Sequence, residues 1–271
     1  MNSSTQHAII TGGSSGIGKA IALRLAAQGA NISIVSRSQE RLDSARVEIE
    51  AARKAADQKV VTVAGDVGDR TQAEQAIQSA IAQLGPPHLL ITSAGIARPG
   101  HFQALSADVF EQAMATNYFG TLYCIRAVLP AMVQQGAGQL CLISSGAALV
   151  GLYGYSAYGP SKFAVRGLAE SLRAELKPVG IRVSIAYPPD TETPLLIEEN
   201  KTKPAATKQI TGTAKAWKAD AVADVILKGI QQNKFEISPG VEIKVLTRLH
   251  SLIAPVLNRY FDGIVAKYSR P

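Results

Sequence analysis

The stretch Thr11-Gly12-Gly13-Ser14-Ser15-Gly16-Ile17-Gly18 decides how the chain begins to fold. It follows the apolar run HAIIT (7–11) and leads into KAIALRLAAQG (19–29), whose apolar residues recur at helical spacing. Glycines between a strand and a helix permit a tight turn and a close approach of the backbone to a pyrophosphate, and the helix N-terminus supplies free N–H donors. The stretch therefore predicts a dinucleotide site, to which we assign Gly12, Ser14, Ser15, Gly16, Ile17 and Gly18.

Short apolar runs alternate with segments of helical spacing along the whole chain. The runs cover 7–11, 32–35, 60–64, 88–92, 140–144 and 181–187, and the helical segments cover 16–29, 38–56, 70–84, 107–135, 157–177 and 219–232. Runs that are apolar throughout and separated by helices indicate a parallel sheet covered on both faces. We expect an α/β fold with a doubly wound, Rossmann-type sheet in a single domain over 1–240, with a substrate lid over 190–216 and a C-terminal extension over 241–271.

The composition is that of a globular protein without a metal centre. Apolar residues make up 46% and charged residues 18% of the 271 positions, which allows a sizeable core. Cys124 and Cys141 lie inside apolar runs, so we expect buried, reduced thiols. The four histidines show no metal-ligand spacing, and we predict no bound metal.

A net charge of +7 is compatible with an anionic partner. Basic and aromatic residues are not interleaved, which speaks against nucleic acid and leaves an anionic cofactor or a membrane surface. The N-terminus enters its first strand without a basic and then apolar leader, and no run of 18 apolar residues occurs. We expect a cytoplasmic protein, with the cytosolic face of a membrane as the open alternative.

The end of the second strand favours NADP(H) over NAD. NAD sites usually place a carboxylate there for the ribose 2′-hydroxyl, but this strand ends in Ser36-Arg37, and Arg41 follows one helical turn later. The guanidinium of Arg37 offers a planar set of donors suited to a 2′-phosphate. Asp66, after the third strand, is placed to accept a hydrogen bond from the adenine amino group, while Asp69 suits the N-cap of the next helix.

Tyr158 and Lys162 are the candidate acid-base pair. They are four residues apart on an expected helix and share one of its faces. A nearby ammonium and the positive nicotinamide of an oxidised cofactor favour the phenolate, so we expect a lowered pKa for Tyr158. Ser145 can hydrogen-bond the same substrate oxygen, and Asn117 can hold a water that links Lys162 to bulk solvent.

These motifs together resemble the short-chain dehydrogenase/reductase family over residues 6–240. The shared pattern comprises the glycine stretch, the pair Asp66-Val67, Asn117, Ser145, and Tyr158 with Lys162. The resemblance implies that Val67 belongs to the cofactor site, that the Thr191 backbone holds the nicotinamide carboxamide and that the Thr193 side chain reaches the cofactor.

Two positions depart from the family pattern. Thr92-Ser93-Ala94-Gly95 replaces Asn-Asn-Ala-Gly, so a threonine hydroxyl would have to replace in part an amide that steadies the sheet centre. Pro189 stands where a glycine is usual.

The loops are similar to those of one group within the family, the reductases of 3-ketosphinganine. The similar segments are YPPDTETP (187–194), EENKTKP (198–204) and the longer stretch 153–178. The resemblance implies NADPH-dependent reduction of this amphiphilic lipid ketone to sphinganine, with Ser144 or Ser145 as hydrogen-bond donor; spacing favours Ser145. The alternatives are a reductase of a steroid, an acyl ketone or a xenobiotic carbonyl, and a cofactor-sensing regulator without catalysis.

Two segments in the last third of the chain give hints about the substrate and its surroundings. The lid carries several charges, and we expect Asp190 or Glu192 to meet an amino group next to the reacting ketone. The stretch 241–271 is rich in apolar residues but holds five basic and two acidic ones, which disfavours a membrane span. We expect a helical pair that lies in the headgroup region or packs against a second subunit of a homo-oligomer.

Overall fold

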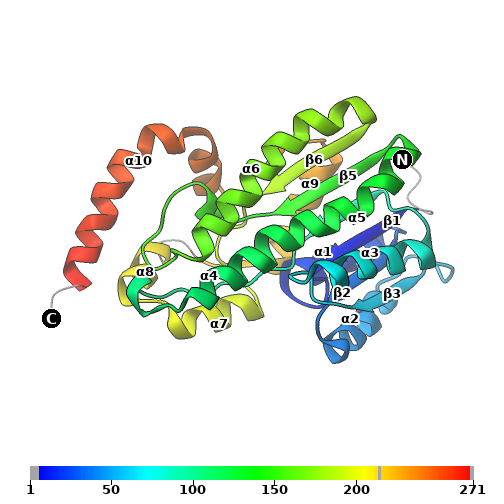
Figure 1. Cartoon of the computed structure of the whole chain (residues 1–271), viewed down its shortest axis with the longest axis horizontal. Coiled ribbons are helices and arrows are strands. Elements are labelled where there is room, and N and C mark those ends of the chain that lie inside the picture. Colours follow the sequence, from blue (N-terminus) through cyan, green and yellow to red (C-terminus); the bar gives the residue numbers. More distant parts are fainter. Residues whose placement is uncertain (1–5, 213–214, 269–271) are drawn as a thin grey trace.

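Seven parallel strands form the sheet of this computed structural model, which describes residues 6–212 and 215–268. The strand order is β3-β2-β1-β4-β5-β6-β9 (Figure 1). The strands are β1 (His7–Thr11), β2 (Asn31–Ser36), β3 (Val60–Ala64), β4 (Leu89–Thr92), β5 (Gly138–Ile143), β6 (Ile181–Ala186) and β9 (Glu236–Ile237). All six expected strands are present and the doubly wound fold is confirmed; within this sheet, only the short edge strand β9 was not predicted.

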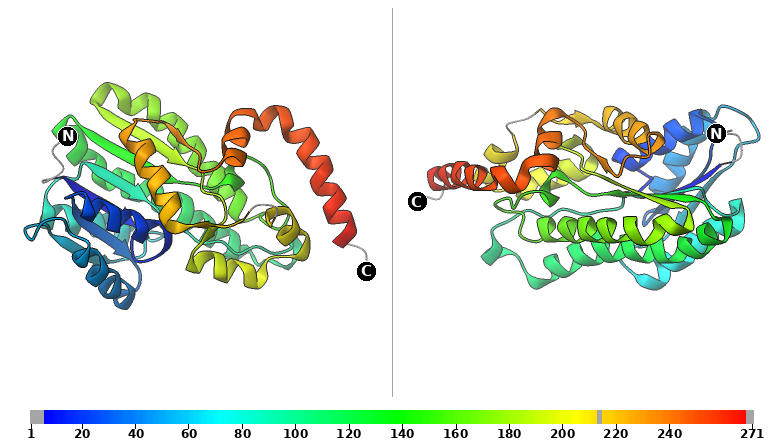
Figure 2. Two further views of the ribbon diagram at one scale, coloured as in Figure 1. Left: turned by 180° about the vertical axis from the view of Figure 1, so that it is seen from behind. Right: turned by 90° about the horizontal axis from the view of Figure 1, so that it is seen from above.

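Helices cover both faces of the sheet, as Figure 2 shows in the view from above. One layer consists of α1 (Gly16–Ala27), α2 (Gln39–Ala51) and α9 (Ala219–Gln231), and the other of α3 (Arg70–Leu84), α5 (Gly120–Gln135) and α6 (Tyr158–Leu176). A short helix α4 (Ala107–Ala113) continues through a π-helical turn (Met114–Phe119) into α5. Because the strand order reverses between β1 and β4, their carboxyl ends open a crevice in which doubly wound folds bind ligands.

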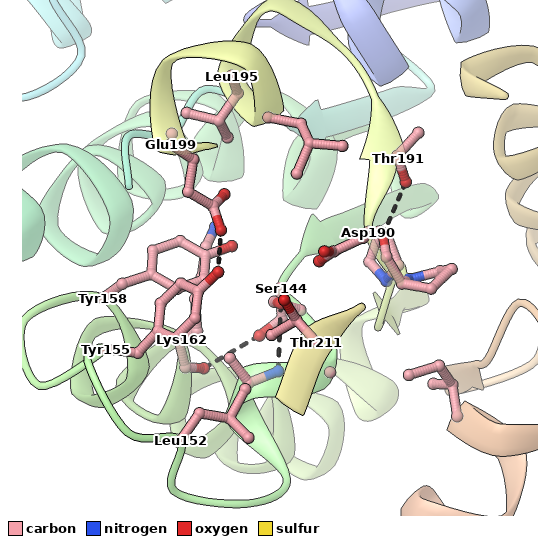
Figure 3. A pocket seen from close by; sticks show the side chains of 18 of the residues that line it. Ser144, Leu152, Tyr155, Tyr158, Lys162, Asp190, Thr191, Leu195, Glu199 and Thr211 are labelled. Atoms are coloured by element: carbon pink, nitrogen blue, oxygen red, sulfur yellow. Dashed lines mark hydrogen bonds between the residues drawn. The ribbon is translucent and has the colours of Figure 1, made fainter. Parts of the chain in front are cut away.

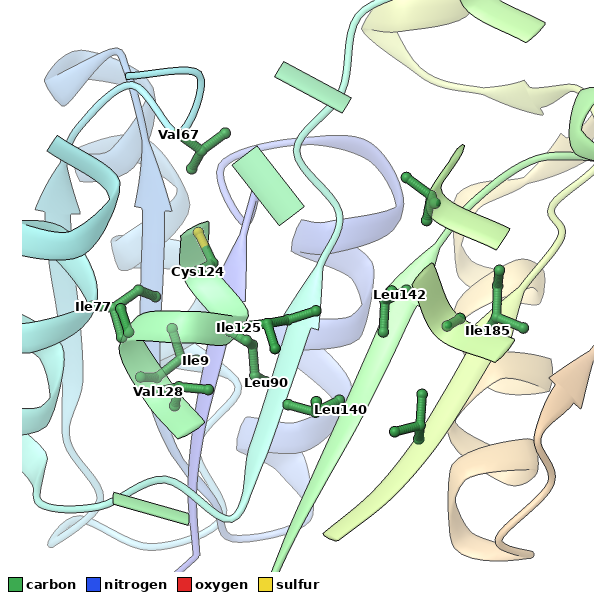
Figure 4. Close-up of a cluster of buried hydrophobic side chains, with 14 of the residues drawn as sticks. Ile9, Val67, Ile77, Leu90, Cys124, Ile125, Val128, Leu140, Leu142 and Ile185 are labelled. Carbon is green, nitrogen blue, oxygen red and sulfur yellow. The ribbon is translucent and has the colours of Figure 1, made fainter. Parts of the chain in front are cut away.

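The core between the sheet and α3 and α5 explains why the strands are apolar throughout. Ile9, Leu90 and Leu140 come from neighbouring strands and pack against Ile77 and Ile125 of the helices (Figure 4). A second cluster fills the opposite face of the sheet. Each strand must therefore supply apolar side chains to both faces, which is the pattern typical of a fully buried parallel sheet.

Both cysteines are buried free thiols, as expected from their apolar surroundings. Burial raises the pKa of the Cys124 thiol and of the Cys141 thiol to about 12. Neither sulfur is therefore a reactive thiolate at neutral pH.

The segment 190–216, expected as an irregular lid, contains regular structure. It holds β7 (Thr191–Glu192), α7 (Pro194–Thr202) and α8 (Ala205–Thr211), and β8 (Trp217–Lys218) follows and pairs with β7. Helix α7 begins here because the Thr193 hydroxyl accepts a hydrogen bond from the Leu196 N–H and proline occupies the first helical position. Residues 213–214 lie outside the described residues.

The C-terminal stretch forms one helix, α10 (Val241–Tyr268), and the expected helical pair is wrong. Pro255 lies inside it, and Figure 1 shows that the helix bends while its second half extends away from the sheet. Ile243 belongs to the main core, whereas Ile264 packs on α8 in a separate small cluster. The helix therefore ties the lid to the body of the protein; residues 269–271 lie outside the described part.

Candidate active site

A cavity of about 440 Å³ lies at the carboxyl ends of the central strands. Its walls come from the glycine turn after β1, the segments after β4, β5 and β6, the lid and α10. Tyr158 and Lys162 lie on its wall, as Figure 3 shows. The structure thus brings the expected proton-transfer pair and the glycine turn to one site.

Tyr158 and Lys162 both lie in the first turns of α6, where Lys162 is buried and Tyr158 is partly buried. The Lys162 ammonium lies 5.7 Å from the centre of the Tyr158 ring and donates a hydrogen bond to the carbonyl oxygen of Ile143 at 3.1 Å. Because Ile143 is the last residue of β5, this bond fixes the lysine to the end of the sheet. Burial lowers the pKa of Lys162 to about 8.

The Tyr158 phenol is less acidic than the sequence predicts. Burial raises its pKa to about 12, although a hydrogen bond from the Ser145 hydroxyl works in the opposite direction. The expectation of a lowered pKa is therefore wrong for the protein alone, because desolvation outweighs the nearby positive charges. A neutral phenol is nevertheless the form that can donate a proton.

The two adjacent serines have different partners. Ser144 donates to the backbone carbonyl of Lys162 at 3.0 Å, which keeps its hydroxyl on α6. The Ser145 hydroxyl accepts a hydrogen bond from the Ala147 N–H, and its interaction with the Tyr158 phenol lowers the pKa of that phenol. This geometry supports Ser145, and not Ser144, as the hydroxyl next to the proton donor.

Asn117 is fully buried in the π-helical turn. Its side-chain oxygen accepts from the Ile96 N–H at 2.9 Å, and its amide donates to the Ile96 carbonyl and to the Ser161 hydroxyl. The side chain thus ties the segment after β4 to α6 and positions the helix that carries Tyr158. The water relay expected for Asn117 stays a prediction.

The glycine turn fits the pyrophosphate of a dinucleotide. Gly12 and Gly16 have φ angles of 68° and 53°, and a Cβ at Gly18 would lie 2.5 Å from the Gly12 carbonyl oxygen. The first turn of α1 contains no acidic residue, and the Ser15 hydroxyl makes no capping bond. The N–H groups at this helix end are therefore available to an anion, and Gly12, Ser15, Gly16 and Ile17 line the cavity.

The remaining cofactor candidates lie near the ends of β2 and β3, outside the cavity wall. Ser14 donates to the Ser36 hydroxyl, which connects the glycine turn with the end of β2. Arg37 follows β2, is largely exposed and lies 3.9 Å from the Asp66 carboxylate. This pair occupies the place expected for the adenosine half of the cofactor.

Three residues near this pair make contacts within the protein that explain their positions. Arg41 is exposed in the first turn of α2, where its N–H bonds the Ser38 hydroxyl. Val67 is buried and packs against Gly120 at the start of α5. Asp69, and not Asp66, caps α3, as the sequence predicts.

The turn after β6 joins the cavity to the lid. Thr191 and Thr193 line the cavity, where the Thr191 hydroxyl donates to the Pro189 carbonyl and the Thr193 hydroxyl to the Thr191 carbonyl. At the end of β4, the buried Thr92 hydroxyl has no hydrogen-bond partner among the described residues, so it does not replace the usual amide. The Thr11 hydroxyl instead accepts a hydrogen bond from the Ala94 N–H.

Several residues of the cavity were not identified from the sequence. Tyr155, Glu199 and Lys203 form a buried polar cluster beside Tyr158, and α10 supplies apolar wall residues. The two tyrosines just before Tyr158, at 153 and 155, were the available signal for Tyr155, whereas nothing local marks Glu199. Asp190 lines the cavity as expected, but Glu192 is exposed outside it and cannot meet a ligand there.

Solved structures with this arrangement contain nicotinamide cofactors. A short chain dehydrogenase/reductase from Burkholderia phymatum in complex with NAD is 23% identical, with a TM-score of 0.82, over 95% of this chain and 96% of that one. A short-chain dehydrogenase from Sphingobium yanoikuyae in complex with NADPH is 24% identical, with a TM-score of 0.78, over 96% of this chain and 95% of that one. These similarities confirm the fold.

Comparisons of sequence identify the family. The model of the family "short chain dehydrogenase" matches residues 6–204. A protein of Mus musculus named 3-ketodihydrosphingosine reductase is 43% identical over 251 residues, which are 92% of this chain and 76% of that protein. The chain therefore belongs to the short-chain dehydrogenase/reductase family and is a nicotinamide-dependent oxidoreductase.

Proposed function

We propose that the protein uses NADPH to reduce the ketone of 3-ketosphinganine to the secondary alcohol of sphinganine. The observation that carries this proposal is a neutral, partly buried Tyr158 that shares the wall of a largely apolar cavity with Ser145 and Lys162. The name of the mouse relative supports the choice of ketone.

Each residue of the site has a separate role in the reduction. The bound reduced nicotinamide supplies the hydride to the carbonyl carbon. Tyr158 donates its proton to the carbonyl oxygen, and Ser145 hydrogen-bonds that oxygen as negative charge develops on it. The Lys162 ammonium stabilises the phenolate that remains.

The apolar part of the cavity suits a long alkyl chain. Side chains from the loop before α6, from the lid and from α10 surround it: Leu152, Leu195, Leu196, Ile210, Ile243, Leu246, Leu257 and Phe261. Burial of each CH₂ group of a ligand contributes about 0.8 kcal/mol, so this wall favours a lipid over a small polar ketone.

Arg37 supports NADPH over NADH as the cofactor. It follows β2 directly, at the position where NAD sites carry a carboxylate, and its guanidinium is exposed. Arg41 stands one turn further on α2 and adds positive charge to the same edge.

An exposed apolar face of α10 supports a contact with a membrane surface. Leu249, Leu252, Val256 and Tyr260 recur at helical spacing and are 42%, 77%, 69% and 52% exposed. No helix among the described residues is long and apolar enough to cross a bilayer. The same helix lines the cavity, so a lipid ketone could pass from the headgroup region to Tyr158 along it.

Replacement of Tyr158 by phenylalanine removes the proton donor and leaves the ring. We expect kcat for 3-ketosphinganine to fall about a hundredfold or more, because general acid catalysis contributes about that much. NADPH oxidation in single turnovers measures the loss, and a fall of only a few-fold contradicts the assigned role. If the native protein reduces only other ketones, the choice of substrate is wrong.

The pH dependence of kcat/KM reports the charge on Lys162. Its pKa of about 8 means that the ammonium is present at pH 7 and lost as the pH rises to 9, whereas Tyr158 keeps its proton over this range. We expect kcat/KM for reduction to fall about tenfold between these pH values, measured with a ketone that has no ionisable group. A flat profile contradicts this role of the lysine.

Arg37→Ala removes the group proposed to hold the 2′-phosphate. We expect KM for NADPH to rise about tenfold, as for loss of a hydrogen bond to a charged group, with little change for NADH. Arg46→Ala is the matched control, because Arg46 is exposed on α2 and pairs only with Glu50 among the described residues. Equal effects on both cofactors would exclude a selective role.

Leu252→Glu and Val256→Glu place charge on the exposed face of α10 and leave the cavity wall intact. We expect less protein to float with liposomes that contain anionic lipid, while Val47→Glu on the exposed face of α2 leaves flotation unchanged. Unchanged flotation of the α10 variants, together with a smaller size in solution, would instead assign this face to the predicted homo-oligomer.

A further inference from the structure

A buried polar cluster adjoins Tyr158 on the lid side of the cavity. Tyr155 donates a hydrogen bond from its hydroxyl to Oε1 of Glu199, and the ring centres of Tyr155 and Tyr158 are 5.6 Å apart. Lys203 lies 3.1 Å from the same Glu199 oxygen and 3.5 Å from the Asp190 carboxylate. The two carboxylates come from different segments, and both lie within 3.5 Å of the same lysine ammonium. Figure 3 shows Glu199 and Asp190 on the wall of the cavity.

The cluster has one more negative than positive group. Glu199 and Asp190 each contribute a carboxylate and Lys203 a single ammonium, whose side chain is only 2% exposed. Burial raises the pKa of Glu199, and Lys203 opposes this rise. An isolated buried negative charge is costly, so a cation that binds here gains more than it would in water.

Glu199 has the features of a binding group and not only of a structural ion pair. Its side chain is only 9% exposed, yet it lines the cavity. Tyr155 and Lys203 both contact Oε1, while Oε2 accepts no hydrogen bond from the described residues. One oxygen of this cavity-lining carboxylate thus has no hydrogen-bond donor among the described residues.

We propose that Glu199 and Asp190, bridged by Lys203, bind the ammonium group on the carbon next to the reacting ketone. The inference rests on the proposed function, since 3-ketosphinganine carries an amino group at that position. The contact through Tyr155 places Glu199 one side chain away from the proton donor, which matches an ammonium nitrogen two bonds away from the carbonyl carbon.

Other charged groups at the cavity are less suited to this task. Lys215 and Glu242 line it from exposed positions, where water screens their charges. Lys162 has the sign of the ligand itself and is held at the end of β5. Tight recognition of a cation therefore falls to the buried Glu199, with the partly exposed Asp190 beside it.

Glu199→Gln and Asp190→Asn test the inference in the full-length protein with NADPH. The two substrates are 3-ketosphinganine and the same ketone without its amino group. We expect KM for the amino ketone to rise about tenfold or more in each variant, as for loss of a charged hydrogen-bond partner, and KM for the other ketone to rise by much less. Glu199→Asp keeps the charge and should restore part of the affinity for the amino ketone.

Glu198→Gln is the matched control, because Glu198 is the neighbouring exposed residue of α7 and pairs with Lys201. It should change neither KM, and thermal unfolding verifies that each variant is folded. Equal rises of both KM values in Glu199→Gln and Asp190→Asn overturn the inference while the proposed function stands. If the native protein fails to reduce the amino ketone but reduces the other one, the proposed function itself is wrong.

Discussion

The hydrogen bond between the Lys162 ammonium and the Ile143 carbonyl oxygen connects the candidate chemistry with the sheet. Burial of an ammonium away from water is unfavourable unless hydrogen-bond or charged partners compensate for it. Here this desolvation lowers the pKa of Lys162 to about 8. The bond fixes the start of α6 over the end of β5, and Tyr158 takes its place one turn earlier on the same helix. Ser144 strengthens this joint, since its hydroxyl bonds the backbone carbonyl of Lys162.

The parts of the site that the sequence predicts are those that follow strands directly. Gly12 follows β1, Arg37 follows β2 and Ser145 follows β5, so the parallel topology alone carries them to one edge of the sheet. Local spacing likewise predicts Tyr158 and Lys162, because two residues four apart on a helix share a face. These residues can be predicted without knowledge of the tertiary contacts.

The remainder of the site depends on contacts that spacing does not encode. Tyr155 and Glu199 meet although 44 positions separate them, and the ion pair of Lys203 with Asp190 forms only because α7 folds back over the turn after β6. The pKa of Tyr158 was wrongly predicted for a related reason: the sequence shows nearby charges but not the extent of desolvation. The short strand β9 was missed because two residues are too few to show a period. The stretch 241–271 was predicted to be helical, but the sequence does not show that one helix continues through Pro255.

Helix α10 serves three neighbours at once: Ile243 joins the main core, Leu257 and Phe261 face the cavity, and Ile264 packs on α8. Substitutions in α10 can therefore change which ligands fit the cavity without altering Tyr158, Lys162 or Ser145. Because α10 forms part of the cavity wall, any shift of this helix also changes the shape of the space in which the alkyl chain of a ligand would lie.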